Sequence, residues 1–219
     1  MPETIPVTPY GDSPRLEMLP FVPPLSARVL DVGCHTGAFG KALKRAGVAM
    51  VWGSEANPAT AAVAAERLDK VVVGYFGPEQ DLPDAFFDAI VFNDVLEHMP
   101  DPNGALEFAR SKLAPGGVVV ASIPNLRHFD NLLHILKERD FRYERNGVRD
   151  ATHLRFYTCK SIPRLFEDSG YAVRRLEGIH EDWWTPSIVR RAAFRLFSSY
   201  LADTRYMQYA VVAAPRSHG

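Results

Sequence analysis

The stretch Val29-Leu30-Asp31-Val32-Gly33-Cys34-His35-Thr36-Gly37 decides the fold. The apolar run over residues 27–32 predicts a buried parallel strand, and the glycines that follow predict a tight turn. Residues 38–46 predict a helix that ends at Gly47. A strand, a glycine turn and a helix in this order are typical of the first unit of an α/β sheet.

The same alternation continues along the chain. It predicts further strands and helices that together form a Rossmann-like sheet covered by helices on both faces. Ligands of such sheets bind at the carboxyl ends of the strands. The other expected strands cover residues 50–54, 71–73, 87–92, 118–123, 171–176 and 205–214, and the other expected helices cover 58–68, 101–114, 126–137, 161–169 and 186–201.

The composition favours a cytoplasmic protein of one domain. The 219 residues suit a single domain, with an extended proline-rich arm over 1–25 and insertions over 126–158 and 180–203 that would cover an acceptor. We expect no membrane span, since no apolar run reaches roughly 20 residues. The two cysteines lie far apart and show no metal spacing, so neither a disulfide nor a metal is expected.

Charge is unevenly distributed. The net charge of −1 argues against general nucleic-acid binding. However, residues 1–124 hold 9 Lys/Arg and 15 Asp/Glu, whereas residues 125–219 hold 16 and 11. The later half could attract an anionic small molecule, or it could be an ordinary solvated surface. The sequence does not predict an oligomeric state.

The glycine turn favours a cofactor without phosphate. A dinucleotide fingerprint would place its second glycine at position 35, where this chain has His35. Asp31 adds a negative charge that opposes a diphosphate and suits an ammonium group. Glu55, about 20 residues beyond the turn, can accept hydrogen bonds from ribose hydroxyls. S-adenosylmethionine (SAM) carries an amino group, a sulfonium and a ribose, and fits these features better than NAD.

Four motifs together resemble a known family. Residues 29–37, 53–56 (Gly-Ser-Glu-Ala), 87–98 (Phe-Asp-Ala-Ile-Val-Phe-Asn-Asp-Val-Leu-Glu-His) and 113–117 (Leu-Ala-Pro-Gly-Gly) look like successive motifs of class I SAM-dependent methyltransferases. This resemblance implies a seven-stranded sheet whose last strand is antiparallel. Residues 122–125, 152–158 and 166–170 resemble a bacterial subgroup, the type 23-like methyltransferases, often associated with glycan and secondary-metabolite pathways. By analogy, the resemblance to this subgroup suggests a sugar hydroxyl as the methyl acceptor.

The resemblance also implies which residues bind the cofactor. The turn lies beneath the methionine part, Glu55 binds the ribose, the stretch after the third strand flanks the adenine, and the end of the fourth strand lines the sulfonium. An N-terminal arm often closes over the cofactor. The implied cofactor residues are Tyr10, Arg15, Asp31, Gly33, Cys34, His35, Gly37, Glu55, Ala56, Tyr75, Phe76, Asn93, Asp94 and Val95.

Two positions depart from the family pattern. His35 replaces the usual second glycine, and Tyr75 stands where an aspartate often contacts the adenine amino group. They leave open a protein that binds SAM as a partner or regulator and no longer catalyses.

Histidines are the candidates for a general base. Methyl transfer is a single displacement, so the protein mainly aligns donor and acceptor, and a hydroxyl acceptor must also lose a proton. His153 is the first candidate and His98 the second, with Asp150 as an orienting carboxylate. Each could also be an ordinary loop residue. Asn125, His128 and Arg155 are candidates for the acceptor site, and Arg155 could instead pair with Asp150 or Glu144.

Two enzyme classes remain open from the sequence. The leading hypothesis is O-methylation of a sugar or a related small-molecule hydroxyl with a histidine base. The alternative is N- or C-methylation of an aromatic, quinone-like or polyketide acceptor. A nicotinamide dehydrogenase is disfavoured by His35.

Overall fold

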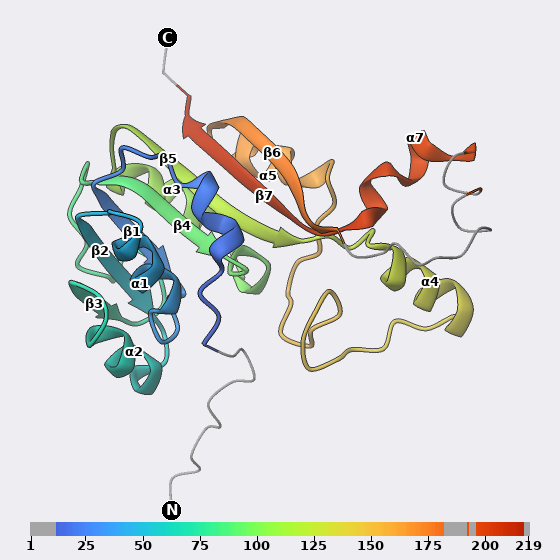
Figure 1. Ribbon diagram of the computed structural model, residues 1–219, viewed down its shortest axis with the longest axis horizontal. Coiled ribbons are helices and arrows are strands. Elements are labelled where there is room, and N and C mark those ends of the chain that lie inside the picture. Colours follow the sequence, from blue (N-terminus) through green and yellow to red (C-terminus); the bar gives the residue numbers. More distant parts are fainter. Residues whose placement is uncertain (1–11, 182–191, 193–195, 217–219) are drawn as a thin grey trace, which may run out of the picture. The chain divides into compact units, whose positions relative to one another are not determined.

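The strands of one seven-stranded sheet follow the order β3-β2-β1-β4-β5-β7-β6 (Figure 1). The computed structural model describes residues 12–181, 192 and 196–216. The chain forms two compact units: the first is Met1–Asn93 with Phe108–Val118, and the second is Asp94–Glu107 with Val119–Gly219. This strand order, with the last strand β7 antiparallel to both of its neighbours, confirms the expected Rossmann-like fold.

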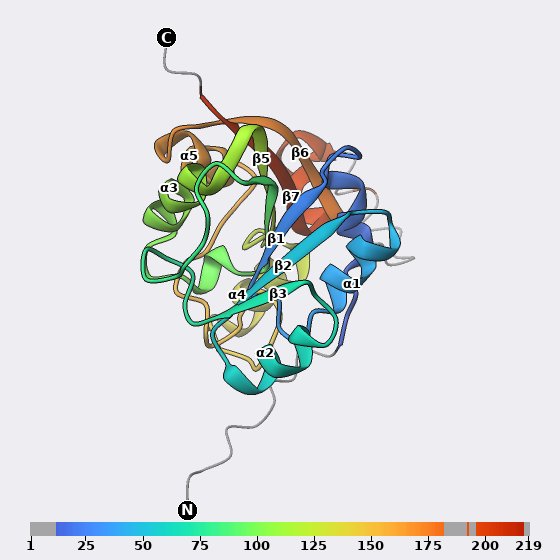
Figure 2. The same cartoon turned by 90° about the vertical axis from the view of Figure 1, so that its left-hand side faces the viewer.

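The first unit contains the parallel half of the sheet. Strand β1 pairs with β2 on one side and with β4 on the other, and β2 pairs with β3, all in parallel. Figure 2 shows β3, β2 and β1 side by side, with the helices α1 and α2 next to them. The bounds are β1 Arg28–Val32, α1 Ala38–Arg45, β2 Met50–Glu55, α2 Pro58–Ala65, β3 Lys70–Val73 and β4 Phe87–Asn93.

Local signals explain where these helices begin. Gly37 caps α1 in a left-handed conformation with φ of 78°, and a side chain at that position would come within 3.2 Å of the Ala64 backbone. Asn57 caps α2 through a side-chain oxygen that accepts from the amide of Ala59, and Pro58 fills the first helical position. These caps fix the turns at the carboxyl ends of β1 and β2.

The expected extended arm over residues 1–25 was partly wrong. Residues Leu16–Phe21 form a 3-10 helix, η1. Met18 and Phe21 are both buried, and their spacing of three residues matches one turn of a 3-10 helix. Apolar residues in a proline-rich stretch can therefore dock as a single turn without the longer period that reveals an α-helix.

The second unit contains the antiparallel half of the sheet. From Val119 onward β5 pairs with β7, which also pairs with β6. The β6–β7 register shifts between Val173 and Arg175. Figure 1 shows β6 and β7 as a long pair with α5 beside them. The bounds are η2 Leu96–His98, α3 Pro102–Lys112, β5 Leu113–Pro124, α4 Phe129–Glu138, α5 Ser161–Asp168, β6 Tyr171–Glu181, α7 Ser198–Leu201, η3 Ala202–Arg205 and β7 Tyr206–Pro215.

The expected elements are confirmed except at some boundaries. Strand β5 begins at Leu113, five residues before its expected start, and β6 continues to Glu181 instead of ending at residue 176. Most of the helix expected over 186–201 lies outside the described residues, and α7 covers its last turn. None of the helices that the structure describes has the length and apolar character of a membrane span.

Candidate active site

Three polar side chains share one face at the carboxyl ends of the parallel strands of the first unit. Asp31 is paired in register with Gly53 of β2 and Val91 of β4. Glu55 and Asn93 each lie two residues further along their strands. Because side chains alternate between faces, Asp31, Glu55 and Asn93 all point to the same side of the sheet. The sequence motifs thus converge on one edge of this unit.

Asp31 is buried and holds its proton above neutral pH. Its residue is 2% exposed, and its Oδ2 has no hydrogen-bond partner among the described residues. Burial, with a further contribution from the charge of Glu55, raises the pKa of Asp31 to about 8. A buried carboxyl with an unused oxygen is suited to receive the ammonium group of a ligand.

Asn93 is a second polar group without a partner. Both its amide nitrogen and its amide oxygen are buried, and neither makes a hydrogen bond within the described part of the chain. Such groups are rare, since leaving one unsatisfied costs about 1–3 kcal/mol. Asn93 therefore offers a donor and an acceptor to a bound molecule at the end of β4.

The turn after β1 accommodates His35 in a conformation that glycine favours. His35 has a φ of 50°. The glycines that flank it in the turn, Gly33 and Gly37, have φ of 67° and 78°. The first of the two expected departures is therefore accommodated by a non-glycine residue in the left-handed conformation. Cys34 packs beneath the turn, where its Sγ would lie 2.5 Å from a side chain at Gly53, and burial raises its thiol pKa.

Glu55 holds this turn through both carboxylate oxygens. Its Oε2 accepts from the amide of His35 at 2.8 Å, and its Oε1 accepts from the amide of Asn57 at 2.9 Å. A carboxylate that accepts from two amides is fixed in position and still has lone pairs for further donors. Glu55 is thus oriented for the predicted hydrogen bonds to ribose hydroxyls.

The residues expected around the adenine have different surroundings. Tyr75 is 88% exposed, and Ala56 is exposed as well. The ring of Phe76 packs edge-on against Phe92 and Phe108, at 5.4 and 5.1 Å between centroids. Tyr75 is therefore available to stack on a base, whereas Phe76 is engaged in the core of the first unit. Their roles toward adenine stay predictions.

The beginning of the described chain is attached to the turn. One oxygen of Asp12 accepts hydrogen bonds from the hydroxyl of Thr36 at 2.5 Å and from the guanidinium of Arg67 at 2.6 Å. These bonds hold the pKa of Asp12 below its ordinary value. Arg15 pairs with Glu17 at 2.7 Å. Tyr10, the other residue expected in the arm, lies outside the described residues.

In the second unit, Asp94 joins the ends of two strands. Its φ is 54°, and its carboxylate accepts from Ser122 Oγ on β5 at 2.8 Å and from Gln208 Nε2 on β7 at 2.9 and 3.0 Å. Asp94 follows β4 directly, and Val95 is the N-cap residue of the short helix η2. This carboxylate is held by the protein itself, so its predicted contact with the cofactor would add to an existing network.

The hydrogen-bond partners of His98 determine which of its two ring nitrogens carries the hydrogen. His98 Nδ1 lies 3.2 Å from the carbonyl oxygen of Thr152 and 3.0 Å from the hydroxyl of Thr152. A carbonyl only accepts, so Nδ1 donates and the lone pair is on Nε2. The Thr152 hydroxyl donates in turn to Asp150 Oδ1 at 2.6 Å. This chain of hydrogen bonds orients His98 as a proton acceptor through Nε2.

His153 lies beside His98 and is more deeply buried. It is 7% exposed, its ring lies 4.7 Å from that of His98, and its Nδ1 donates to the carbonyl of Val148 at 3.2 Å. Burial, and to a lesser extent His98, lowers the pKa of His153. The imidazole is therefore neutral near pH 7, with its lone pair also on Nε2.

Glu97 is a buried carboxylate close to His153, and it was not among the site residues predicted from the sequence. Glu97 is 1% exposed, and its Oε1 lies 4.0 Å from His153 Nε2. Asp150, the expected orienting carboxylate, accepts instead from the amide and the hydroxyl of Thr152. Asp150 thus supports His98 through Thr152. In the sequence, the only feature that pointed to Glu97 as a site residue was its position next to His98 after the fourth strand.

Neither of the pairings weighed for Arg155 is the one observed. Its guanidinium donates to the carbonyls of Leu154 at 3.0 Å and Pro100 at 2.8 Å. Glu144 pairs with Arg149 instead. Arg155 is exposed, and its role toward an acceptor stays a prediction.

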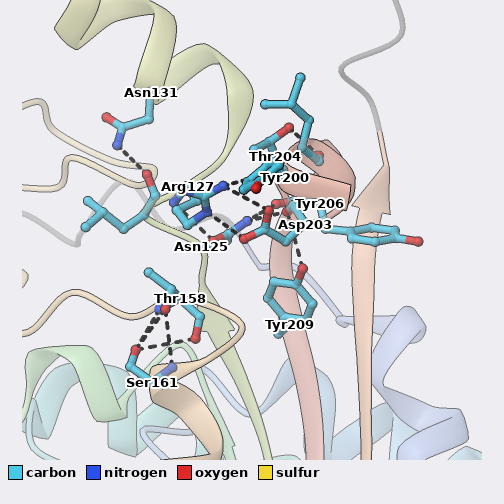
Figure 3. A network of polar contacts seen from close by, with 12 residues as sticks. Asn125, Arg127, Asn131, Thr158, Ser161, Tyr200, Asp203, Thr204, Tyr206 and Tyr209 are labelled. Carbon is cyan, nitrogen blue, oxygen red and sulfur yellow. Dashed lines mark hydrogen bonds and ion pairs between the residues drawn. The ribbon is translucent and has the colours of Figure 1, made fainter. Parts of the chain in front are cut away.

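Asn125 holds a polar network at the end of β5 (Figure 3). Its amide donates to the carbonyls of Asp203 at 2.8 Å and Tyr206 at 2.9 Å, and its oxygen accepts from the amide of Arg127 at 3.0 Å. Both donors of this amide are thereby used within the protein, and the expected contact of Asn125 with an acceptor stays a prediction. His128 is buried at the start of α4, and its expected contact with an acceptor stays a prediction.

Comparisons with known proteins identify the family of the chain. Residues 12–176 match a family described as "Methyltransferase domain". Two curated relatives, both named ubiquinone biosynthesis O-methyltransferase, come from Aeromonas salmonicida and Psychrobacter arcticus. They are 29% and 30% identical to this chain over 70% of its length. The chain spans 66% and 62% of the lengths of these two relatives, respectively.

A solved structure shares the fold. The crystal structure of a SAM-dependent methyltransferase from Archaeoglobus fulgidus is 21% identical, with a TM-score of 0.65, over 90% of this chain and 89% of that one.

Proposed function

Since the chain belongs to the methyltransferase domain family, whose cofactor is SAM, we propose that it transfers a methyl group from SAM to a hydroxyl oxygen of a small molecule. SAM supplies a methyl group on a sulfonium, which is already electrophilic. The acceptor oxygen forms a bond to this methyl, the bond from methyl to sulfur breaks, and the acceptor loses its proton. The protein therefore has to bind SAM and the acceptor, align the acceptor oxygen with the methyl group, and accept the proton of the acceptor.

The fit of SAM rests on the first unit. Asp31 Oδ2 and the Asn93 amide are buried polar groups without protein partners, and they share a face with the oriented carboxylate of Glu55. The amino group and ribose of SAM are the donors and acceptors that such a set would satisfy. The turn at His35 carries no second glycine, which disfavours a diphosphate.

The orientation of His98 is the observation that favours oxygen as the methylated atom. Its Nδ1 donates to Thr152, so Nε2 is left to accept a proton from a hydroxyl. An amine that arrives neutral would not need this base. The names of the curated relatives also support transfer to oxygen.

The acceptor class has two supported candidates. The motifs over residues 122–125 and 152–158 resemble a subgroup associated with glycan pathways, which supports a sugar hydroxyl. The relatives' names support a hydroxyl of a ubiquinone precursor. Phe141 packs against Tyr143 and Phe156, so this part of the second unit presents aromatic surface that suits a sugar or a flat ring.

Turnover with paired variants tests the proposal. Purified protein would be supplied with SAM and a panel of sugar and catechol acceptors, and release of the demethylated cofactor would be measured. We expect His98→Gln to lower kcat by about 10²-fold and to leave the SAM dissociation constant unchanged. His134→Gln, on α4 and away from the His98–His153 pair, should leave both values unchanged.

Each other result has a defined meaning. An unchanged kcat in His98→Gln would contradict the base and favour an amine or carbon acceptor. SAM binding without turnover on any acceptor would favour a regulator that no longer catalyses. A protein that binds neither SAM nor its demethylated product would overturn the cofactor assignment.

A further inference from the structure

Three potential metal ligands lie together in the second unit. One carboxylate oxygen of Glu97 and one ring nitrogen each of His98 and His153 all lie within 4.8 Å of one another. Glu97 and His153 are buried, and His98 is partly exposed. We propose that these three residues, here called the Glu97 cluster, bind a divalent transition-metal cation.

The ligand types favour a transition metal over magnesium. Two imidazoles and one carboxylate form a set that suits Zn²⁺, Fe²⁺, Mn²⁺ and related ions, whereas Mg²⁺ prefers oxygen ligands and water. Three protein ligands also leave open coordination positions, as catalytic metal sites do. No metal was expected from the sequence because the two cysteines show no metal spacing. His98 and His153 are 55 positions apart, and only the fold brings them together.

The groups around the cluster hold the imidazoles in the orientation that a metal requires. In each histidine Nδ1 donates to a backbone carbonyl, that of Thr152 for His98 and that of Val148 for His153. Each ring therefore presents its Nε2 lone pair. Metal-binding histidines usually donate their other nitrogen in this way, which fixes the tautomer and strengthens the ligand.

The backbone around the cluster is fixed as well. The carbonyl of Glu97 accepts from the amides of Leu154 at 2.8 Å and Arg155 at 3.0 Å. These bonds connect the loop that carries His153 to the helix η2 that carries Glu97 and His98. The ligands thus come from two segments that the protein itself holds together.

The ligand distances are those expected of a site that contracts around an ion. His153 Nε2 and Glu97 Oε1 are 4.0 Å apart, too far for a hydrogen bond. Ligands about 2.0–2.2 Å from one ion lie closer to each other than this. A contraction of about 1 Å through side-chain rotation would complete the site.

This inference rests on the proposed function only for the role of the ion. A Lewis acid in this position would lower the pKa of an acceptor hydroxyl. Because the ion would occupy the Nε2 lone pair of His98, it would take over from that histidine the task of promoting loss of the acceptor's proton. Binding of the ion itself can be measured without any acceptor.

Metal content and calorimetry test the proposal on protein without a polyhistidine tag. We expect one equivalent of Zn²⁺ or Co²⁺ to bind, with Mg²⁺ binding far more weakly. Glu97→Gln and His153→Gln should each weaken Co²⁺ binding by 10-fold or more, and His134→Gln should leave it unchanged. Retained affinity for the demethylated cofactor would show that each variant is folded.

Two results would overturn the metal site. One is the absence of stoichiometric Zn²⁺ or Co²⁺ binding to the folded protein. The other is unchanged Co²⁺ affinity in both variants. If methyl transfer then proceeds fully in the presence of EDTA, the cluster acts through its imidazoles alone, and the proposed function stands without the metal.

Discussion

Asp31 gives the protein a pH dependence that one substitution should remove. The folded state keeps Asp31 protonated up to a pKa of about 8, whereas an unfolded chain ionises it near 3.8. Between these values the folded state binds more protons, so its stability falls as pH rises. Asp31→Asn removes this effect. We compare the Tm of the ligand-free variant with that of the ligand-free natural sequence. The difference, variant minus natural, should be at least about 5 °C larger at pH 8 than at pH 5.

The same substitution should weaken the cofactor site. Without a carboxylate to receive the amino group of SAM, the dissociation constant should rise about tenfold or more at pH 8.5, measured by calorimetry. Asp84→Asn is a matched control, since Asp84 is exposed and pairs with Lys112. A Tm difference that does not vary with pH, or unchanged SAM affinity, would contradict this account of Asp31.

At the scale of single residues, the sequence predicted local roles better than distant ones. Asp31 and Glu55 were found because Asp31 is the last residue but one of its strand and Glu55 is the last of its own, and strand ends meet at one edge of a parallel sheet. Glu97 was missed as the neighbour of His153 because the two are far apart in sequence, and only the fold brings them together. The engagement of Asn125 was missed for the same reason, since its partners lie near residue 205.

At the scale of elements, one ion pair should hold α7 and η3 in place. The guanidinium of Arg127 binds Asp203 through Nε at 2.7 Å and Nη2 at 3.2 Å and donates to the carbonyl of Tyr200 at 2.7 Å (Figure 3). Arg127→Met should speed amide hydrogen exchange over residues 196–205 by several-fold. Because the pair is partly exposed, the Tm should fall by less than about 3 °C.

The control for this prediction is Arg175→Met. Arg175 pairs with Glu177 on the edge strand β6 and is not part of the Asn125 network. Exchange over residues 196–205 should be unchanged in that variant. If Arg127→Met exchanges no faster than Arg175→Met, the Arg127–Asp203 pair does not hold these helices.

Boundaries were harder to predict than the elements themselves. Among the described strands, β6 lies at the edge of the sheet and pairs with β7 alone. Its polar residues after position 176 can therefore continue the strand without being buried. The apolar run that marks a buried strand therefore ends before the strand does. Strand β5 begins at Leu113 although Pro115 and Gly116 are poor strand formers, and the two residues are exposed there.

At the scale of the whole molecule, ligand binding should be coupled to global stability. Strand β5 runs from Leu113 to Pro124 and belongs to the first unit up to Val118 and to the second from Val119. A strand shared by two units cannot lose its order in one without affecting the other, so we expect a single unfolding transition. The demethylated cofactor at 100 times its dissociation constant adds about 2.7 kcal/mol, and the Tm should rise by about 5–10 °C. Differential scanning calorimetry, with adenosine at the same concentration as a weakly binding control, measures this shift. Two transitions, of which the ligand moves only one, would show that the units unfold independently and that β5 does not couple them.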